Sequence, residues 1–173
     1  SSDVCSSDLA VDNNNITISN CNIANYFSAG TVSAGIFVSN TNANSSNTWL
    51  ITNNKFYQTA IRVFTSSLPT LSAITVAGGA GFTISNNTIG YSNAAGTGYT
   101  SLIGNSVTLA GFPTSYAVAG TATATRYTAI NCAFATAGST SYIVGNTIAG
   151  LALYTSSGAT TTYGILCGIQ VTS

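Results

Sequence analysis

The chain has 173 residues, enough for one domain with a sizeable core, and 3% of them are charged, against about 25% in an average soluble domain. Three basic residues, three acidic residues and no histidine leave no basic patch for a nucleic acid and no histidine for general base catalysis or metal binding. Serine, threonine and asparagine make up 68 residues (23, 27 and 18), so the surface is expected to be rich in hydroxyl and amide groups. Because 45% of the chain is hydrophobic, the composition disfavours disorder.

The first nine residues, SSDVCSSDL, stand apart from the rest of the chain. Residues 3–9 resemble one reading frame of a common sequencing adapter, and a genuine polar N-terminus is the alternative. The resemblance implies that residues 1–9 are a disordered artefact and that residues 10–173 are a fragment of a longer protein from environmental DNA. Without residues 1–9, Asp12 is the only acidic residue.

A four-residue motif, Gly or Ala followed by Ile, any residue, and Val or Cys, occurs five times. Its copies are residues 35–38, 60–63, 73–76, 129–132 and 164–167. In a β-strand, a period of two places the Ile and the Val or Cys on one face and the variable residue on the other. The motif therefore predicts five buried isoleucines, at Ile36, Ile61, Ile74, Ile130 and Ile165. Arg62 and Thr75, at the variable position, are predicted to point outward.

A second motif alternates with the first. It begins with an Ile and ends with another apolar residue five positions later, and the residues between them are mostly polar and include Asn. Three copies, at residues 18–23, 51–56 and 84–89, are spaced by 33 residues. A looser copy lies at 143–148 and a degenerate one at 103–107. No helical period is sustained, and the abundant Ser, Thr, Asn and Gly disfavour helices whereas Val, Ile, Thr and Tyr favour strands. The sequence therefore predicts an all-β fold.

Short recurring strands with loops of unequal length favour a parallel β-solenoid over a sandwich. Over residues 13–171, the pattern resembles right-handed parallel β-helix proteins of the pectate-lyase-like type. It is also similar to the long Ser/Thr/Asn-rich β-strand-repeat proteins of bacterial cell surfaces, particularly of Bacteroidetes. The resemblance implies that residues 10–173 form a single-stranded right-handed parallel β-helix of about five coils, without caps, and roughly 25 Å long at about 4.8 Å per coil.

The asparagines of the second motif are candidate structural residues. An Asn after a short strand suits a turn with a left-handed backbone, where stacked amides can bond from coil to coil. We expect such an Asn ladder at Asn20, Asn53, Asn86 and Asn146. Calcium ligation is the alternative, but calcium sites favour several carboxylates and only Asp12 is available, so no metal is predicted.

Three cysteines remain after residue 9. Cys132 and Cys167 stand where other copies of the first motif have Val, so they are predicted to be small core residues. A disulfide between them is the alternative, although side chains stacked in line rarely have its geometry. Cys21 is expected in a turn, and its redox state and those of the other two are left open by the sequence.

The pectate-lyase-like resemblance also raises the question of catalysis. Lyases of this fold use aspartates for Ca²⁺ and a basic residue as the base, and its hydrolases use clustered aspartates, because glycoside cleavage generally needs two carboxylates. Asp12 cannot supply a pair, so no catalytic residue and no cofactor is predicted. Lys55, Arg62 and Arg126 are scattered and are predicted to be surface charges rather than a substrate clamp.

Tyrosines offer a flat apolar face that can stack on sugar rings. Tyr26, Tyr57 and Tyr91 each follow the second motif by a few residues and are candidate carbohydrate-binding residues on one face of the rod. The alternative is that they cover the core or bridge coils. A Thr-alternating run at 121–125 is a weak sign of an ice-binding surface, which would need such a run in every coil.

We therefore expect a non-catalytic structural or adhesive β-helix segment of a large secreted or cell-surface bacterial protein. Its expected partners are polysaccharides or surface glycans and adjacent coils of the parent protein, with no nucleic acid and no transmembrane segment. The alternative is a scaffold portion of a polysaccharide lyase or glycoside hydrolase whose catalytic residues lie outside this chain. The location rests on the family resemblance alone.

Overall fold

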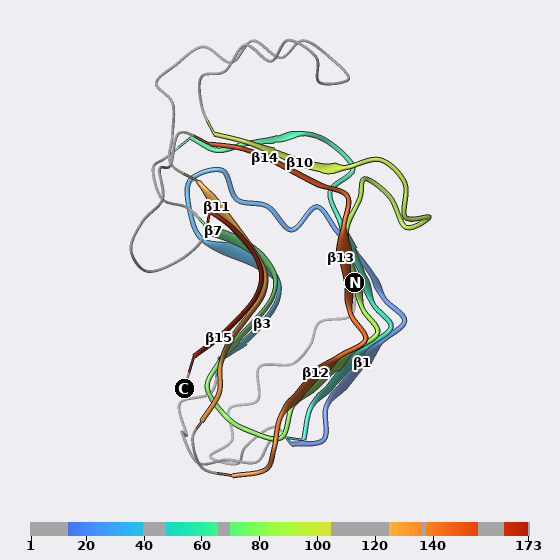
Figure 1. The fold of residues 1–173 in the computed structure, drawn as a ribbon, viewed down its shortest axis with the longest axis vertical. Helices are drawn as coiled ribbons and strands as arrows, with labels where there is room; N and C mark the ends of the chain where they lie inside the picture. Colours follow the sequence, from blue (N-terminus) through green and yellow to red (C-terminus); the bar gives the residue numbers. More distant parts are fainter. Residues whose placement is uncertain are drawn as a thin grey trace.

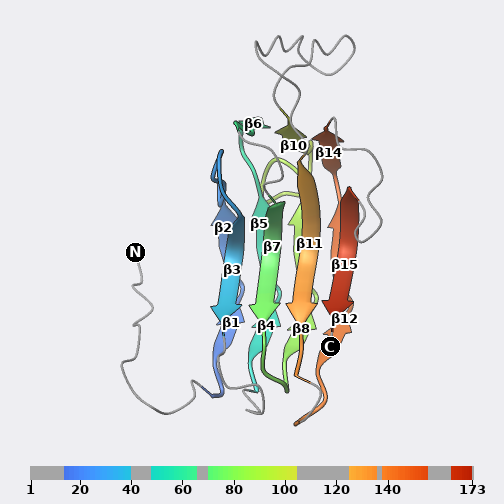
Figure 2. The same cartoon turned by 90° about the vertical axis from the view of Figure 1, so that its left-hand side faces the viewer.

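The computed structural model describes residues 14–39, 48–65, 70–104, 125–135, 138–155 and 165–172. Within these ranges all regular structure is β-strand and there is no helix, which confirms the predicted all-β class. The strands form four parallel sheets, which we label A to D (Figures 1 and 2). Residues 1–9 and all of the threonine run except Thr125 lie outside the described residues.

Each sheet collects one strand from successive passes of the chain. Sheet A contains β1 (Thr17–Ser19), β4 (Leu50–Thr52), β8 (Thr83–Ser85) and β12 (Tyr142–Val144). Sheet B contains β2 (Asn22–Ala24), β5 (Lys55–Tyr57), β9 (Thr88–Gly90) and β13 (Thr147–Ala149). Sheet C contains β3 (Ser33–Ser39), β7 (Thr70–Ala77), β11 (Arg126–Ala133) and β15 (Leu166–Thr172). Sheet D contains β6 (Arg62–Val63), β10 (Thr100–Ile103) and β14 (Leu151–Tyr154).

The chain visits the sheets in the order A, B, D, C, and each strand pairs in parallel with the strand of the next pass. We call each pass a coil: β1–β3 form coil 1, β4–β7 coil 2, β8–β11 coil 3 and β12–β15 coil 4. In cross-section, sheet C faces sheets A and B, and sheet D lies at one end (Figure 1). This topology is compatible with a β-solenoid, with four coils in the described residues where the sequence suggested about five.

The second motif stacks in register, as predicted. Its first isoleucines form one column in sheet A: Ile18, Ile51, Ile84 and Ile143. Its second apolar residues form a column in sheet B: Ile23, Phe56, Ile89 and Ile148. The members in coils 2 and 3 are completely buried because like side chains cover them from both neighbouring coils.

A left-handed residue turns the chain from sheet A into sheet B in every coil. Asn20, Asn53 and Asn86 have φ angles of 56°, 57° and 54°, and Gly145 has φ 66° at the same place in coil 4. Asn and Gly are the residues that tolerate this backbone region best. Asn20, Asn53 and Asn86 are therefore explained by the sharp bend that their left-handed backbone makes possible.

The first motif aligns for three of its five copies. Ile36, Ile74 and Ile130 lie opposite one another in sheet C and are buried. In coil 4 their partner is Ile169 rather than Ile165, so the stacked copy is residues 168–171, which also fits the motif.

The predicted copy at residues 60–63 was also misplaced. Its strand β6 pairs with β10 in sheet D, where Arg62 faces Leu102, and not with sheet C. Ile61 and Ile165 are half-buried, so the prediction that both are core residues was wrong.

Aromatic side chains fill the space between sheet C and sheets A and B. Phe56, Phe64, Phe82 and Tyr127 are among the largest completely buried side chains. Phe82 stacks on Phe134 with ring centroids 5.8 Å apart. A cross-section this wide needs large side chains because aliphatic columns alone would leave voids.

Candidate binding groove

Sheet C bends inward at mid-length, which makes its outer face concave (Figure 1). The residues at the bend are small: Gly35, Ala73, Ala129 and Gly168 occupy the positions between the registered pairs on either side. A Cβ atom at Gly35 would lie 2.9 Å from Cδ1 of Phe56 and 2.8 Å from the carbonyl oxygen of Ala73. Small residues therefore allow the sheet to approach the core here.

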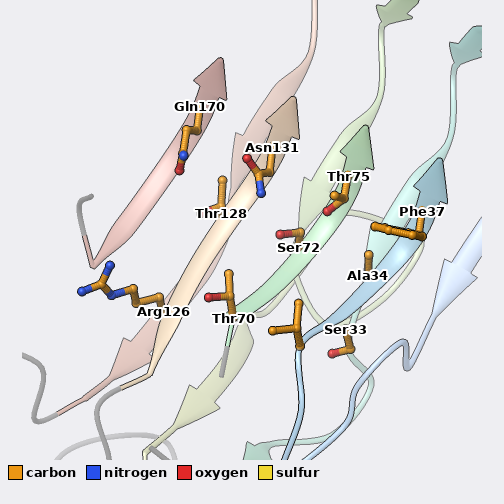
Figure 3. A pocket seen from close by; sticks show the side chains of 11 residues that line it. Ser33, Ala34, Phe37, Thr70, Ser72, Thr75, Arg126, Thr128, Asn131 and Gln170 are labelled. Atoms are coloured by element: carbon orange, nitrogen blue, oxygen red, sulfur yellow. The ribbon is translucent and has the colours of Figure 1, made fainter. Parts of the chain in front are cut away.

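The concave face forms a hollow of about 660 Å³, a volume within the usual range for ligand sites. Its lining comes from all four strands of sheet C and the residue before β3 (Figure 3): Val32, Ser33, Ala34, Phe37, Thr70, Ser72, Thr75, Arg126, Thr128, Asn131 and Gln170. We call this hollow the sheet C groove. Most of its lining side chains carry hydroxyl, amide or guanidinium groups.

One wall of the groove is a row of side chains that runs along the coil axis. Phe37, Thr75, Asn131 and Gln170 are register partners on successive strands (Figure 3). Phe37, at the end of the row, is 63% exposed. The row therefore offers repeated hydrogen-bonding groups, one coil apart, beside a single aromatic face.

The floor and the opposite wall also carry polar groups, beside the apolar side chains of Val32 and Ala34. Ser72 and Thr128 are register partners near the bend, and Thr70 faces Arg126 at the strand ends. Arg126 is the only charged residue among the lining residues. The groove thus has groups that suit neutral hydroxyl-rich ligands and one cation that suits an acidic substituent.

None of these residues is predicted from the sequence to form a binding site. The signal was present, because the variable position of the first motif is occupied by Phe37, Thr75 and Asn131 and, in the corrected alignment, by Gln170. That position was identified as outward for Thr75, which lines the groove as a half-buried residue. The concave shape of sheet C, which makes this outward column part of a groove, could not be predicted from the sequence.

The three tyrosines selected from the sequence lie in three different columns. Tyr26 points into the interior, where its ring meets Phe56 edge-on with centroids 6.1 Å apart and its hydroxyl is buried. Tyr57 lies on β5 opposite Ala24 and is half-buried. Tyr91 follows β9 with φ 62°, and a Cβ atom on Gly150 would lie 2.5 Å from its Cδ1 atom. They do not form one face, and Tyr26 packs against the core cluster.

The Asn ladder exists, but its members are Asn54, Asn87 and Asn146. Oδ1 of Asn87 accepts from N–H and Nδ2 of Asn54 at 3.0 and 3.1 Å, and Oδ1 of Asn146 accepts from the same groups of Asn87 at 3.0 and 2.9 Å. The predicted Asn20, Asn53 and Asn86 each precede this position by one residue and form the bend. Of the predicted ladder, only Asn146 belongs to it.

Lys55 and Arg62 bind groups of the chain itself. Lys55 is exposed, and its Nζ donates to the Ala94 carbonyl oxygen at 2.7 Å. Arg62 is half-buried and donates to Gln58 at 2.9 Å and to Asn25 of coil 1. Its guanidinium also lies 5.8 Å from the centroid of Phe27. Arg62 therefore ties two coils together through a hydrogen bond that is itself exposed.

The three described cysteines are free. Cys132 occupies the predicted core slot and is completely buried, and burial raises the pKa of its thiol to about 12, opposed by a backbone hydrogen bond at Val76. Cys167 lies opposite Thr128 rather than in the Val column, because the motif copy in coil 4 was misaligned. The expectation of a core role for Cys167 and the alternative of a Cys132–Cys167 disulfide are both wrong for this structure.

Two tyrosines, Tyr26 and Tyr127, also have raised pKa values. Burial raises the pKa of the Tyr127 phenol well above its ordinary value of 10.0, and the neighbouring Tyr26 raises it further. Burial likewise raises the pKa of Tyr26, although contacts with Tyr127 and Gln58 oppose the shift. These groups stay neutral in the fold well beyond the pH at which an exposed phenol ionises.

We expect the free energy of unfolding to be nearly constant from about pH 5 to pH 8 and to fall above about pH 9. The unfolded chain loses thiol and phenol protons near the ordinary values of about 8.5 and 10, whereas the folded chain keeps them, so rising pH favours unfolding. Urea midpoints measured between pH 5 and pH 11 test this, and Tyr127→Phe should reduce the alkaline loss. A marked loss between pH 5 and pH 8 would contradict the assignment, since the described residues contain no Asp, Glu or His.

Within the described ranges, no group of three His, Cys, Asp or Glu residues lies close enough to hold a metal ion. The same part of the chain contains no helix long and apolar enough to cross a membrane. Comparisons with protein-family models, with curated proteins and with solved structures give no match.

Proposed function

We propose that this chain is a right-handed parallel β-solenoid segment whose sheet C groove binds an extended polysaccharide without catalysing its cleavage. The observation that carries the proposal is the in-register row of Phe37, Thr75, Asn131 and Gln170 along the groove. The secreted or cell-surface location expected from the sequence resemblance is part of the same proposal.

The order of strands supports the solenoid. Coils 2 to 4 pass through all four sheets in the same order, coil 1 follows that order without a strand in sheet D, and every pair of strands is parallel. The right-handed sense is supported by Figures 1 and 2, in which the chain circulates counter-clockwise while advancing toward the viewer of Figure 1. Right-handed crossovers are also the rule for parallel strands.

The direction of the row supports a polymer over a compact ligand. Successive strands are about 4.8 Å apart, so four strands present a row of side chains over roughly 14 Å. Coils 2 to 4 each add a hydroxyl or amide group, which suits a ligand that itself repeats along its length. Phe37 provides an apolar face for one sugar ring, and the hydroxyl and amide groups suit ring hydroxyls.

The chemistry of the lining supports binding without cleavage. Glycoside hydrolysis generally uses two carboxylic acids, and the acidic residues of the chain are Asp3, Asp8 and Asp12, which all lie ahead of the described residues. The lining residues of the groove include no carboxylate. Arg126 can contact an acidic substituent but has no carboxylate beside it among the lining residues with which to share acid–base work.

Affinity electrophoresis in gels containing hydroxyethyl cellulose, amylose or polygalacturonate tests the proposal. We expect retardation by at least one of these polymers, and Phe37→Ala should weaken binding about tenfold through loss of ring stacking. Asn131→Ala should weaken it several-fold because an amide that binds ring hydroxyls is lost.

Tyr57→Ala serves as the matched aromatic control, because Tyr57 lies on sheet B, away from the groove. If Tyr57→Ala abolishes retardation while Phe37→Ala does not, the binding surface lies on sheet B and the groove assignment is wrong. Release of reducing ends from any of the polymers would overturn the non-catalytic part of the proposal.

A further inference from the structure

The Asn ladder has a direction along the coil axis. Each ladder Asn reaches back to the coil before it: Asn87 accepts from the N–H of Asn54 at 3.0 Å and donates through Nδ2 to the Ile51 carbonyl oxygen at 2.9 Å. Asn146 repeats this arrangement one coil later, with Asn87 and the Ile84 carbonyl oxygen as its partners. Each coil therefore uses its Asn to bind the preceding coil.

The ladder stops at the N-terminal end of the stack. Cys21 occupies the ladder position in coil 1, and its N–H donates to Oδ1 of Asn54 at 3.0 Å. Its thiol donates to the Ser19 carbonyl oxygen at 3.3 Å, within the same coil. Coil 1 thus receives an Asn from coil 2 but carries no amide that could reach toward a coil before it.

At the C-terminal end of the stack, the last ladder Asn has no described acceptor for its own backbone N–H. The N–H groups of Asn54 and Asn87 each donate to the next ladder Asn, whereas no described residue accepts a hydrogen bond from the N–H of Asn146. Asn146 is half-buried, unlike the completely buried Asn54 and Asn87. The ladder is terminated at coil 1 and can continue beyond coil 4.

The burial of sheet C shows the same asymmetry. Ile36 and Val38 of coil 1 are 8% and 5% exposed, whereas Ile169 and Val171, in the same columns of coil 4, are 47% and 53% exposed. Four further large hydrophobic residues of coil 4 are also exposed: Tyr142, Val144, Tyr154 and Leu166. Strands β12–β15 carry no charged residue and no proline, the usual protection of a sheet edge.

We infer that the edge formed by β12, β13, β14 and β15 docks a further parallel coil of this repeat that carries Asn at its ladder position. The docking continues the interface that already joins coils 3 and 4, with the same backbone pairing, the same apolar columns and the same amide contacts. This inference is independent of the proposed polysaccharide binding.

Coil 1 of a second copy does not meet these requirements. It presents Cys21 where Asn146 needs an amide oxygen, and its residues 25–32 contribute no strand to sheet D. Head-to-tail stacking of two copies would therefore leave the edge of β14 and the N–H of Asn146 without partners. Coils of the type of coils 2 to 4 provide both.

The test is a chain in which a copy of residues 40–77, which contains all of coil 2, follows Ser173. We expect the melting temperature to rise by about 5 °C or more, because each added coil contributes a nearest-neighbour interface. Hydrogen exchange at the N–H of Asn146 should slow at least tenfold. Asn54→Ala in the added copy should remove the protection of that N–H.

The matched control places the same copy ahead of residue 10, against coil 1. A smaller rise in melting temperature is expected there, and Cys21→Asn should increase it by supplying the missing ladder amide. Equal gains at the two ends, or unchanged exchange at Asn146, would overturn the inference. Light scattering of the unaltered chain provides a further check. If it shows head-to-tail oligomers, and a proline placed in β3 prevents them, the edge docks a second copy of this chain and the inference is overturned.

Discussion

Replacing Asn87 by alanine is expected to reduce the free energy of unfolding by about 3 to 5 kcal/mol. Asn87 is completely buried and makes four side-chain hydrogen bonds, two from Asn54 and one each to Ile51 and Asn146. Alanine leaves the N–H of Asn54 without an acceptor in the interior, and each such buried group costs about 1 to 3 kcal/mol. Urea unfolding followed by far-UV circular dichroism measures the loss.

The adjacent residue provides the control. Asn86 is exposed and has φ 54°, so its contribution is the left-handed turn, which glycine adopts readily. We expect Asn86→Gly to change the free energy of unfolding by less than about 1 kcal/mol. If Asn86→Gly is as damaging as Asn87→Ala, the division of roles between the two asparagines is wrong.

That division explains why the sequence predicted a ladder but placed most of it one residue early. An Asn-Asn pair offers two chemically identical side chains, and both the turn and the ladder require an Asn. The pair is resolved only by backbone geometry, because the residue in the left-handed region points its side chain to solvent while the next residue points inward. Coil 4 supplied the missing clue, since Gly145 replaces the turn residue and leaves Asn146 for the ladder.

The first motif shows the other limit of sequence reasoning. Residues 164–167 and 168–171 both fit it, and only strand pairing selects the second. The alternation of inward and outward residues could be predicted, and with it the core positions of Ile36, Ile74 and Ile130. The sheet C groove could not, because it arises from small residues such as Gly35 at a bend, and a short motif does not distinguish a flat sheet from a bent one.

Gly90→Ala is expected to be the most damaging single change at the interface between coils 3 and 4, with a loss of at least about 4 kcal/mol. Gly90 is buried in β9 with φ 115°, a conformation that residues with a Cβ atom rarely adopt. A Cβ atom there would lie 1.8 Å from the carbonyl oxygen of Ala149, its register partner on β13. The two strands must separate to accommodate it.

Gly96→Ala separates strain from collision. Gly96 also has positive φ, 75°, but the nearest atoms to its added Cβ are those of the Tyr91 ring, at 3.9 Å or more. The cost there is expected to be about 1 to 2 kcal/mol, from the backbone alone. In a stack in which each coil contacts only its neighbours, the Gly90 change should also release coil 4 before the rest. Hydrogen exchange should then accelerate in β12–β15 while β4–β7 keep their protection, and uniform acceleration across all coils would instead indicate that the four coils unfold as one unit.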